Sequence, residues 1–375
     1  MHIEPFAVEQ WMNAHETTAR WNIAETCVHP LRVDELLRLG GEADETLKRL
    51  LATRLTYGHI TGSPELRGAI AALYGAAVSA ADVLVAGGAI AANFLVHFAL
   101  VAPGDGVVCV TPTYQQLHSV PEALGAQVRL LPLRPEDGYL VDVDELRSLV
   151  DERTRLIVIN NPNNPTGSLM GEGRLREIVA VARSCGAYLH CDEVYRYLEH
   201  ETGATAPSVV DLYDRGISTG SMSKTFSLAG LRTGWVVAPP EVLERCLEVR
   251  DYTTISCGVL DDALAAMALT AREALLARSL AIVRENVELL DAWVRAEPRL
   301  HCVRPRAGTT ALVRYDQALP SEQLCQGLFD FNGAFVVPGA CFGQEGTFRV
   351  GYACAREVLV GGLAAVSEYL HTLEG

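Results

Sequence analysis

The sequence predicts an α/β fold with a mostly parallel central sheet flanked by helices and a smaller α+β domain attached to it. Between residues 83 and 238, short apolar runs rich in β-branched residues alternate with amphipathic helical stretches. This alternation is typical of βαβ units. The runs are apolar along their whole length, as strands buried on both faces are. After about residue 260 the alternation ends, and a long helical region leads into short strands.

Seven strands are expected in the central sheet of the large domain. They cover residues 83–87, 106–110, 127–133, 155–160, 187–192, 217–221 and 234–238. The helical stretches expected between them cover residues 91–102, 115–124, 143–150 and 172–185. Ligands of open α/β sheets bind beyond the carboxyl ends of the strands. Residues directly after these strands are therefore candidates for a binding site.

The remainder of the chain predicts the smaller domain. It comprises a helical region at 261–296, strands at 301–305, 310–315, 334–338 and 347–353, and helices around 320–330 and 356–372. The first 35 residues contain few clear strands, and we expect them to pack on this part of the protein. We therefore divide the chain into a large domain of residues 36–270 and a small α+β domain of residues 1–35 plus 271–375.

Charge and cysteine usage exclude several classes of protein. The net charge of the 375 residues is −15, which repels nucleic acid and anionic membranes, so neither is an expected partner. The longest apolar run, 86–102, contains Asn93 and His97 and does not read as a membrane span. The ten cysteines form no CxxC pair, and the sequence predicts no metal site. Without a recognisable signal peptide, they read as reduced thiols in a cytoplasmic protein.

A lysine lies among small hydroxyl residues in GSMSKTFSLAGLRTGW, residues 220–235, where an expected strand ends. Ser221 and Ser223 precede Lys224, and Arg232 follows it by eight positions. Hydroxyl groups and a guanidinium bind phosphate, and a lysine amine condenses with an aldehyde. The segment therefore predicts a site for a ligand that carries both groups, such as pyridoxal 5'-phosphate (PLP). The alternative is a solvated loop.

Two further segments offer partners for the ring of such a cofactor. CDEVYRYL places Asp192 at the end of an expected strand and Tyr195 three residues later. A carboxylate beside the pyridine nitrogen keeps the ring able to withdraw electrons, and Tyr195 can reach the ring hydroxyl. INNPNNPTG, after another strand, is a rigid turn that presents the amide of Asn164. The alternatives are a helix-capping aspartate and a plain turn.

Three weaker segments complete the predicted site. In VAGGAIAANF, a helix begins at Gly88, Ala89 and Ile90, and the free N–H groups at a helix start bind phosphate. Tyr114 in TPTYQQL can lie flat against the ring, although a lone aromatic residue is more often part of a core. Arg349 stands in the apolar strand TFRVGYA, where it needs an anionic partner: an amino acid's carboxylate or an internal salt bridge.

Taken together, these motifs resemble the class I/II aminotransferases of PLP fold type I, from about residue 40 to 370. NPNNPTG, CDEVY, SxSKTFSLAGLRTGW and FRVGYA occur in the order of that family. The resemblance implies a PLP-dependent amino acid aminotransferase that acts through a Schiff base on Lys224 and a quinonoid intermediate. It implies catalytic roles for Lys224, Asp192 and Tyr195. It implies cofactor contacts from Gly88, Ala89, Ile90, Tyr114, Asn164, Asp192, Tyr195, Ser221, Ser223, Lys224 and Arg232. It implies substrate contacts from Arg349 and Asn164.

The resemblance also implies a homodimer with shared active sites. LTYGHITGSPELRGAI, residues 55–70, is similar to the family's N-terminal segment. In that family the tyrosine of this segment, here Tyr57, contacts the cofactor phosphate of the neighbouring subunit.

The sequence departs from the family pattern in places that bear on the reaction. Ile90 stands where many relatives have a polar side chain, and the segment 20–37 lacks the family's glycine-rich substrate loop. This segment, with 249–256 and 305–315, resembles the branch that contains capreomycidine synthase and arginine-processing enzymes. The resemblance to this branch implies an alternative reaction: elimination, cyclisation or oxidation of an amino acid in specialised metabolism. Glu16 and Glu25 are either ligands of a basic substrate side chain or solvated and capping residues.

Overall fold

Seven strands form the central sheet of the computed structural model, which describes residues 2–41, 43–201, 203 and 205–373. They are β2 (Val83–Ala86), β3 (Gly106–Thr111), β4 (Gln127–Pro132), β5 (Thr154–Asn160), β6 (Tyr188–Asp192), β7 (Gly216–Ser221) and β8 (Gly234–Val237). Their order is β2-β8-β7-β6-β5-β3-β4. Strand β8 pairs antiparallel with β2 and β7, and the other pairs are parallel. The predicted mostly parallel sheet is confirmed.

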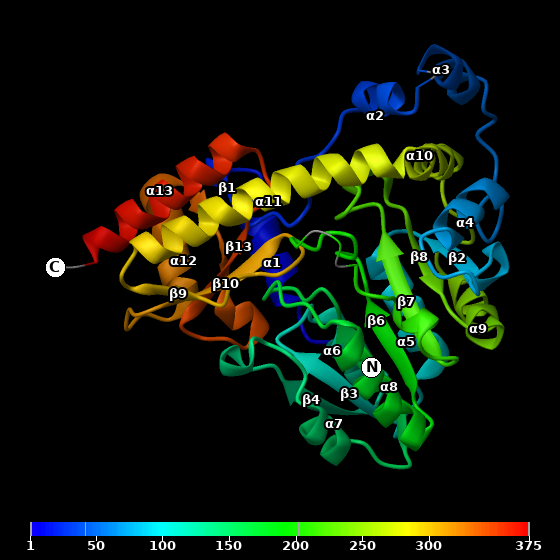
Figure 1. Ribbon diagram of the computed structural model, residues 1–375, viewed down its shortest axis with the longest axis horizontal. Coiled ribbons are helices and arrows are strands. Elements are labelled where there is room, and N and C mark those ends of the chain that lie inside the picture. The colour runs from blue at the N-terminus through cyan, green and yellow to red at the C-terminus, as the bar shows by residue number, and fades with distance from the viewer. Residues whose placement is uncertain (1, 42, 202, 204, 374–375) are drawn as a thin grey trace.

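Helices cover both faces of this sheet (Figure 1). They are α4 (Pro64–Ala71), α5 (Ala89–Leu100), α6 (Gln116–Ala123), α7 (Val143–Leu149), α8 (Glu172–Cys185) and α9 (Pro240–Arg250). Alternate strand residues enter different apolar clusters: Val108 and Ile157 pack with the residues of α7 and α8, and Val107 and Leu156 pack with those of α5 and α9. Strands β2, β3 and β8 are largely buried and apolar, as the sequence indicated. The edge strand β4 is partly exposed, and β7 consists mostly of small and hydroxyl residues.

A second sheet of four strands lies at the other end of the molecule. It contains β9 (Leu300–Cys302), β10 (Thr310–Tyr315), β12 (Val337–Pro338) and β13 (Thr347–Gly351), in the order β12-β13-β10-β9. Two helices, α12 (Ser321–Asn332) and α13 (Arg356–Thr372), accompany it. The long helical region predicted at 261–296 is two helices, α10 (Val259–Thr270) and α11 (Arg272–Ala296). The break falls at Ala271, where α10 packs on α4 and α11 packs on α13.

The N-terminal segment packs on this second part of the protein. Helix α1 (Ala7–His15) and strand β1 (Trp21–Asn22) precede α2 (Val33–Leu39) and α3 (Ala43–Leu51), and β1 pairs in parallel with β11 (Ala334–Phe335). Residues 8–28 share one apolar cluster with residues 283–370. The domain division at residues 35/36 and 270/271 stays a prediction, and its outer ends at residues 1 and 375 lie outside the described residues.

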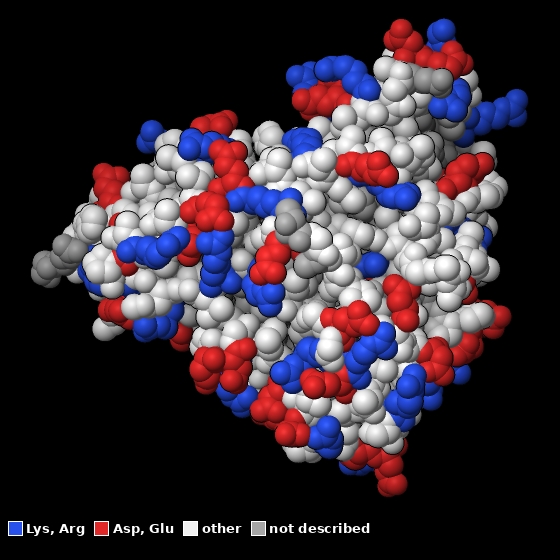
Figure 2. All heavy atoms as spheres, viewed as in Figure 1, with Lys and Arg blue, Asp and Glu red and all other residues white. Residues whose placement is uncertain are grey.

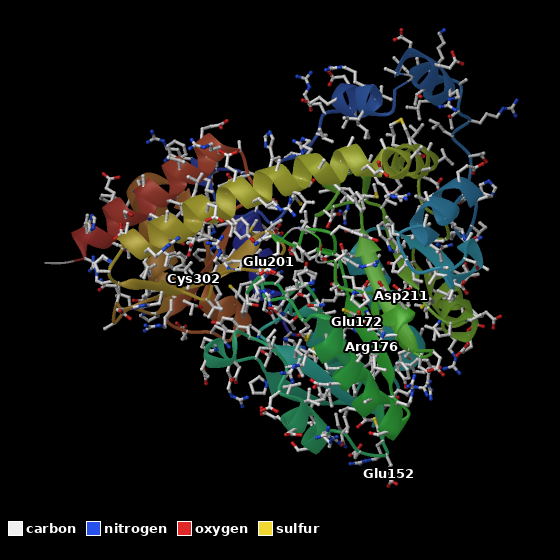
Figure 3. The ribbon with its side chains drawn as sticks, viewed as in Figure 1. Glu152, Glu172, Arg176, Glu201, Asp211 and Cys302 are labelled. Atoms are coloured by element: carbon white, nitrogen blue, oxygen red, sulfur yellow. The ribbon has the colours of Figure 1, made fainter. Side chains whose placement is uncertain are left out.

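Charged side chains of both signs are mixed over the face that Figure 2 shows. On α8, Glu172 and Arg176 lie one helical turn apart on the outside of the protein (Figure 3), with 2.6 Å between carboxylate and guanidinium. None of the helices in the described ranges has the length and apolar character that crossing a bilayer requires.

Candidate active site

A cavity of about 290 Å³ lies where the parallel strands of the central sheet end. It is lined by Ala89, Ile90, Tyr114, Asn164, Asp192, Tyr195, Ser221, Ser223, Lys224, Arg232 and Arg349, which the sequence predicted as site residues. The opposite wall is formed by α1 and by residues 25–27 of the N-terminal segment. The cavity therefore lies between the central sheet and the part of the protein that carries β13.

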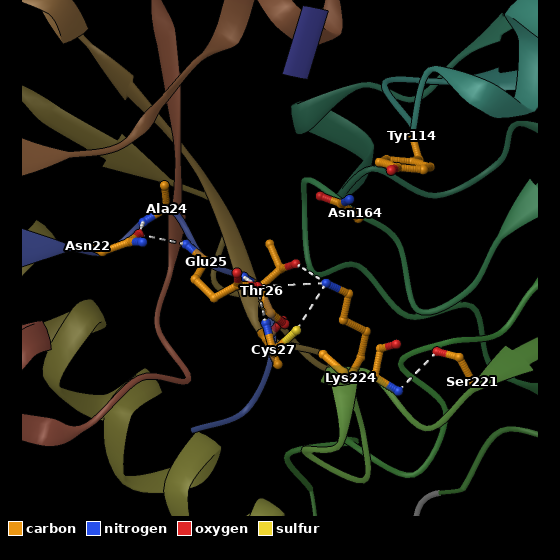
Figure 4. Close-up of polar contacts among 12 residues, drawn as sticks. Asn22, Ala24, Glu25, Thr26, Cys27, Tyr114, Asn164, Ser221 and Lys224 are labelled. Carbon is orange, nitrogen blue, oxygen red and sulfur yellow. Dashed lines mark hydrogen bonds and ion pairs between the residues drawn. The ribbon is translucent and has the colours of Figure 1, made fainter. Parts of the chain in front are cut away.

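Lys224 reaches into the cavity from the turn after β7. The strand ends at Ser221, whose hydroxyl oxygen accepts a 3.2 Å hydrogen bond from the Ser223 N–H. The Lys224 side chain is 24 % exposed. Its Nζ donates to Thr26 Oγ1 at 2.6 Å and to Cys27 Sγ at 3.4 Å (Figure 4). The Lys224 amine is thus hydrogen-bonded to the N-terminal segment. The sequence analysis did not predict this contact.

The turn between β2 and α5 forms a tight corner against Arg232. Gly88 is the N-cap of α5 and has a φ of 86°, a conformation that favours glycine. A Cβ at this position would come within 2.7 Å of Arg232 Nη2. The N–H groups of the first helical turn have no partners within the helix. Gly88, Ala89 and Ile90, together with the Arg232 guanidinium, therefore form a cradle for an anion.

Asp192 is buried at the end of β6 and is held by two donors. Asn93 Nδ2 donates to its Oδ2 at 2.8 Å, and the Val194 N–H donates to its Oδ1 at 3.2 Å. Thr219 Oγ1 donates to Asn93 Oδ1 at 2.6 Å, which leaves the Asn93 amino group to face the carboxylate. Burial raises the pKa of Asp192, and the Asn93 and Val194 hydrogen bonds and the Lys224 charge oppose that shift.

Asn164, Tyr195 and Arg349 form one wall of the cavity. The Asn164 N–H donates to Asn160 Oδ1 at 2.7 Å, which anchors the turn after β5. Asn164 Oδ1 accepts a 3.2 Å hydrogen bond from Arg349 Nη1. Tyr195 is 2 % exposed, and burial raises the pKa of its hydroxyl. These side chains are fixed before any ligand binds.

Arg349 projects from β13 and is 3 % exposed. Its Nη2 donates to the Ala24 carbonyl at 2.9 Å, whereas its Nε is buried and has no hydrogen-bond partner among the described residues. No carboxylate of the described residues forms a salt bridge with it, so the internal salt bridge considered as an alternative is not formed there. A buried guanidinium with an unpaired N–H matches a carboxylate ligand.

Tyr114 joins the cavity to the N-terminal helix. Its hydroxyl donates to Glu9 Oε1 at 2.6 Å, and its ring lies 4.8 Å from the ring of Phe6. Tyr57, in contrast, lies outside the cavity, and 73 % of its surface is exposed. Within one chain, therefore, Tyr57 contacts none of the other predicted site residues that line the cavity.

The residues that the sequence reasoning missed at the site include Asn93, Glu9, Thr26 and Cys27. Asn93 carried a usable signal, because a polar residue in an apolar helix needs a buried partner. Glu25 caps the N–H groups of Thr26 and Cys27, as one of its two interpretations expected, and it also lies 3.8 Å from Lys224 Nζ. Glu16 is exposed at the cavity wall.

Comparison with known proteins identifies the family. The model of the aminotransferase class I and II family matches residues 42–365. The chain is 35% identical over 366 residues to capreomycidine synthase of Streptomyces vinaceus, covering 97% of this chain and 93% of the relative. It is 30% identical over 324 residues to the arginine–pyruvate transaminase AruH of Pseudomonas aeruginosa, covering 83% and 81%.

Solved structures agree with this assignment. A PLP-dependent aminotransferase from Streptococcus suis matches with a TM-score of 0.96 and 39% identity, over 100% of both chains. The PLP-dependent cyclase OrfR matches with a TM-score of 0.91 and 30% identity, over 100% of this chain and 98% of the other. The cofactor of this protein is PLP. The chain belongs to the class I and II aminotransferases, and it is a PLP-dependent enzyme.

Proposed function

We propose that the protein is an amino acid aminotransferase in which Lys224 carries PLP. The observation that supports this most directly is the meeting of Lys224, Asp192 and Arg349 in one cavity. These residues come from three different strands or strand ends, and each supplies a different group: an amine, a buried carboxylate and a buried guanidinium. An aldehyde cofactor with a ring nitrogen, and a substrate with a carboxylate, need these three groups.

The cavity fits PLP on grounds that are independent of the family. At the corner of Gly88 and Arg232, the φ of 86° at Gly88 favours glycine, and the helix start offers its N–H groups to a phosphate. The two oxygens of Asp192 accept one hydrogen bond each, from Asn93 and from Val194, so the carboxylate can accept another from a ring N–H. Asn164 and Tyr195 line the same cavity as Lys224 and can donate to a ring hydroxyl.

Each side chain of the cavity has a different role in the proposed reaction. PLP supplies an aldehyde that bonds to amines and a ring that withdraws electrons from the substrate Cα. Arg349 holds the substrate carboxylate, and Asn164 fixes the Arg349 guanidinium in that direction. Lys224, once released, takes the proton from Cα and returns it during transamination. Asp192 keeps a proton on the ring nitrogen.

Carboxylates on the cavity wall favour a substrate with a cationic side chain. Glu9 and Glu16 at α1 and Glu25 after β1 line the same cavity. Negative groups around a small cavity raise the local concentration of cations. One relative is by name an arginine–pyruvate transaminase. We therefore propose a basic amino acid, with arginine as the first to test, as the substrate.

A second candidate function is cyclisation, elimination or oxidation of that amino acid. It is supported by the similarity to capreomycidine synthase and to a PLP-dependent cyclase. One structural observation supports it: Thr26 and Cys27 of the N-terminal segment accept hydrogen bonds from the Lys224 amine at the cavity wall. Both candidates share the removal of the Cα proton by Lys224 and differ only in the later steps of the reaction.

The two candidates are separated by adding single amino acids to the purified enzyme with and without a keto acid. For transamination, we expect arginine to bleach the visible absorbance of the lysine-bound cofactor, and a keto acid to restore it. Neutral amino acids are expected to act more weakly. Turnover without an acceptor, with release of ammonia, peroxide or a cyclic product, would favour the second candidate. An unchanged absorbance with every amino acid would contradict both.

We also propose that two copies of the chain share their active sites. Exposed apolar side chains gather on and beside α3: Leu51 is 79 % exposed, Leu55 81 % and Tyr57 73 %. A groove of about 770 Å³ separates α2 and α3 from α10. Apolar surface of this extent is typical of protein interfaces. A second copy that covers it would bring Tyr57 to the cavity of its neighbour.

Light scattering tests this dimer directly. We expect the protein to have about twice its chain mass of 40.5 kDa, and Leu55→Asp to shift it towards monomer and weaken retention of PLP. Val360→Asp is the matched control, because Val360 is a 44 % exposed apolar residue on α13, away from α3. A wild-type protein of single-chain mass, fully active with PLP bound, would rule out shared sites.

A further inference from the structure

We propose that Glu25 is a positioning residue for the free Lys224 amine, which it holds at the cavity wall and whose cationic form it stabilises. The inference rests on the assignment of Lys224 as the cofactor-bearing lysine in the proposed function. Three acceptors face Nζ: Thr26 Oγ1 at 2.6 Å, Cys27 Sγ at 3.4 Å and Glu25 Oε1 at 3.8 Å. An ammonium has three N–H groups to donate, so the turn matches the protonated form.

The carboxylate of Glu25 is fixed in this place by its own turn (Figure 4). Its Oε1 accepts hydrogen bonds from the N–H groups of Thr26 at 2.6 Å and of Cys27 at 2.8 Å. Asn22 Oδ1 in turn accepts from the N–H groups of Ala24 at 3.1 Å and of Glu25 at 3.2 Å. The Glu25 side chain is therefore already held in place before the Lys224 amine contacts it.

Residues in and beside the second sheet contact the backbone of the turn at residues 24–26. Arg349 donates to the carbonyl of Ala24, and Thr309 Oγ1 donates to the carbonyl of Thr26 at 2.7 Å. Gly351 of β13 lies so close to the Glu25 carbonyl that a Cβ there would overlap it. The turn is thus built into the packing of β13 and is not a free loop.

The titratable groups that face Lys224 come from two directions. Cys27 and Glu25 lie on the turn, and Tyr195 and Asp192 lie at and after the end of β6. Burial raises the pKa of the Cys27 thiol and of the Tyr195 hydroxyl, so both are uncharged near neutral pH. Asp192 is engaged by Asn93 and Val194. The Arg349 guanidinium is the positive group on the β13 side of the turn.

Glu25 is therefore the anion that is free to act on Lys224. Burial alone would raise its pKa, but the Lys224 charge and the Cys27 and Thr26 hydrogen bonds lower it to about 2. For Lys224, burial lowers the pKa, and Cys27, Tyr195 and Glu25 together raise it above its usual range. Because Cys27 and Tyr195 attract a cation only when they are ionised, Glu25 supplies the attraction near neutral pH.

A lysine with high proton affinity is a strong base and a poor acid. It takes the substrate's Cα proton readily and returns that proton reluctantly. Transamination and ring closure both need a proton returned to the substrate, and every turnover needs a neutral Nζ to re-form the bond to the aldehyde. Glu25 therefore acts on each step in which Nζ gains or loses a proton.

The test measures capture of PLP by the full-length protein after the cofactor has been stripped from it. Only the neutral amine attacks the aldehyde, so the rate at which the visible absorbance rises at a fixed pH of about 8 reports the neutral fraction of Lys224. Glu25→Gln keeps an oxygen for the N–H groups of Thr26 and Cys27 but removes the charge. Loss of an anion disfavours the ammonium, so we expect capture to become about tenfold faster, which corresponds to a fall of about one unit in the Lys224 pKa.

Three variants control this result. Glu25→Asp retains the charge and should keep the wild-type capture rate. Glu16→Gln removes a carboxylate from the same cavity, and Cys27→Ala removes the thiol, and both should leave the capture rate unchanged. An unchanged capture rate in Glu25→Gln, or a faster rate in Cys27→Ala instead, overturns the inference. Reduction with borohydride and peptide mass analysis then locates PLP: on any residue other than Lys224, the proposed function fails as well, whereas on Lys224 only the inference fails.

Discussion

Replacing Lys224 with Ala is expected to abolish the visible absorbance of the lysine-bound cofactor and to lower turnover by at least about four orders of magnitude. Both losses have one cause, because the same amine bonds to the aldehyde and moves the proton at Cα. The Nζ atom lies inside the cavity in contact with Thr26, and no other amine lines that cavity among the described residues. The measurement is an absorbance spectrum with added PLP, followed by an assay with the best amino acid.

The chain offers a matched control for this prediction, because it contains only two lysines. Lys48 lies on α3 with 74 % of its side chain exposed and 3.7 Å from Glu45. Lys48→Ala is expected to keep both the absorbance and the activity. If Lys224→Ala retained the absorbance while Lys48→Ala lost it, the assignment of the cofactor-bearing lysine would be wrong.

Replacing Asp192 with Asn is expected to leave the cofactor on Lys224 and to lower kcat by about 10²- to 10³-fold. The variant amide cannot balance a positive ring nitrogen, so the ring withdraws electrons less well. The Asn93 amino group would also face an amide, because Thr219 occupies the Asn93 oxygen. A buried donor opposite a second amide loses the charge-assisted hydrogen bond that it now makes.

Measuring kcat and KM separately distinguishes this role from a structural one. We expect KM for the amino acid to change much less than kcat, since the proposed function assigns the substrate carboxylate to Arg349, whose Nη1 donates to Asn164 and not to Asp192. Asp214→Asn serves as the control, because Asp214 is 81 % exposed and lies 3.5 Å from Arg183. Wild-type kcat in Asp192→Asn would show that the ring nitrogen needs no anion in this enzyme.

Residues at strand ends were predictable because two signals coincide there. Asp192 and Ser221 each end a buried strand, and polar groups at the ends of such strands meet at one edge of a parallel sheet. Arg349 was predictable for a related reason, since a lone cation in an apolar strand demands a partner. The strands of the central sheet lie within one residue of their predicted bounds, because short runs between helical stretches mark them in the sequence.

The wall formed by α1 and residues 25–27 could not be predicted in this way. Glu9 meets Tyr114, and Thr26 meets Lys224, across 105 and 198 positions of the chain. These contacts depend on how β1 pairs with β11, and a two-residue strand carries no periodicity from which to predict that pairing. The break at Ala271 was missed for a similar reason, since neither glycine nor proline marks it.

The pairing of β1 with β11 also determines when the enzyme becomes complete during its synthesis. Trp11 donates to the Val336 carbonyl and Arg349 to the Ala24 carbonyl, each across 325 positions of the chain. Residues 11–24 therefore lack these partners until residues 334–351 have been synthesised. Until then the central sheet can fold, but one side of its cavity stays open to water. The nascent chain is thus kept from amino acid chemistry until that later segment has emerged.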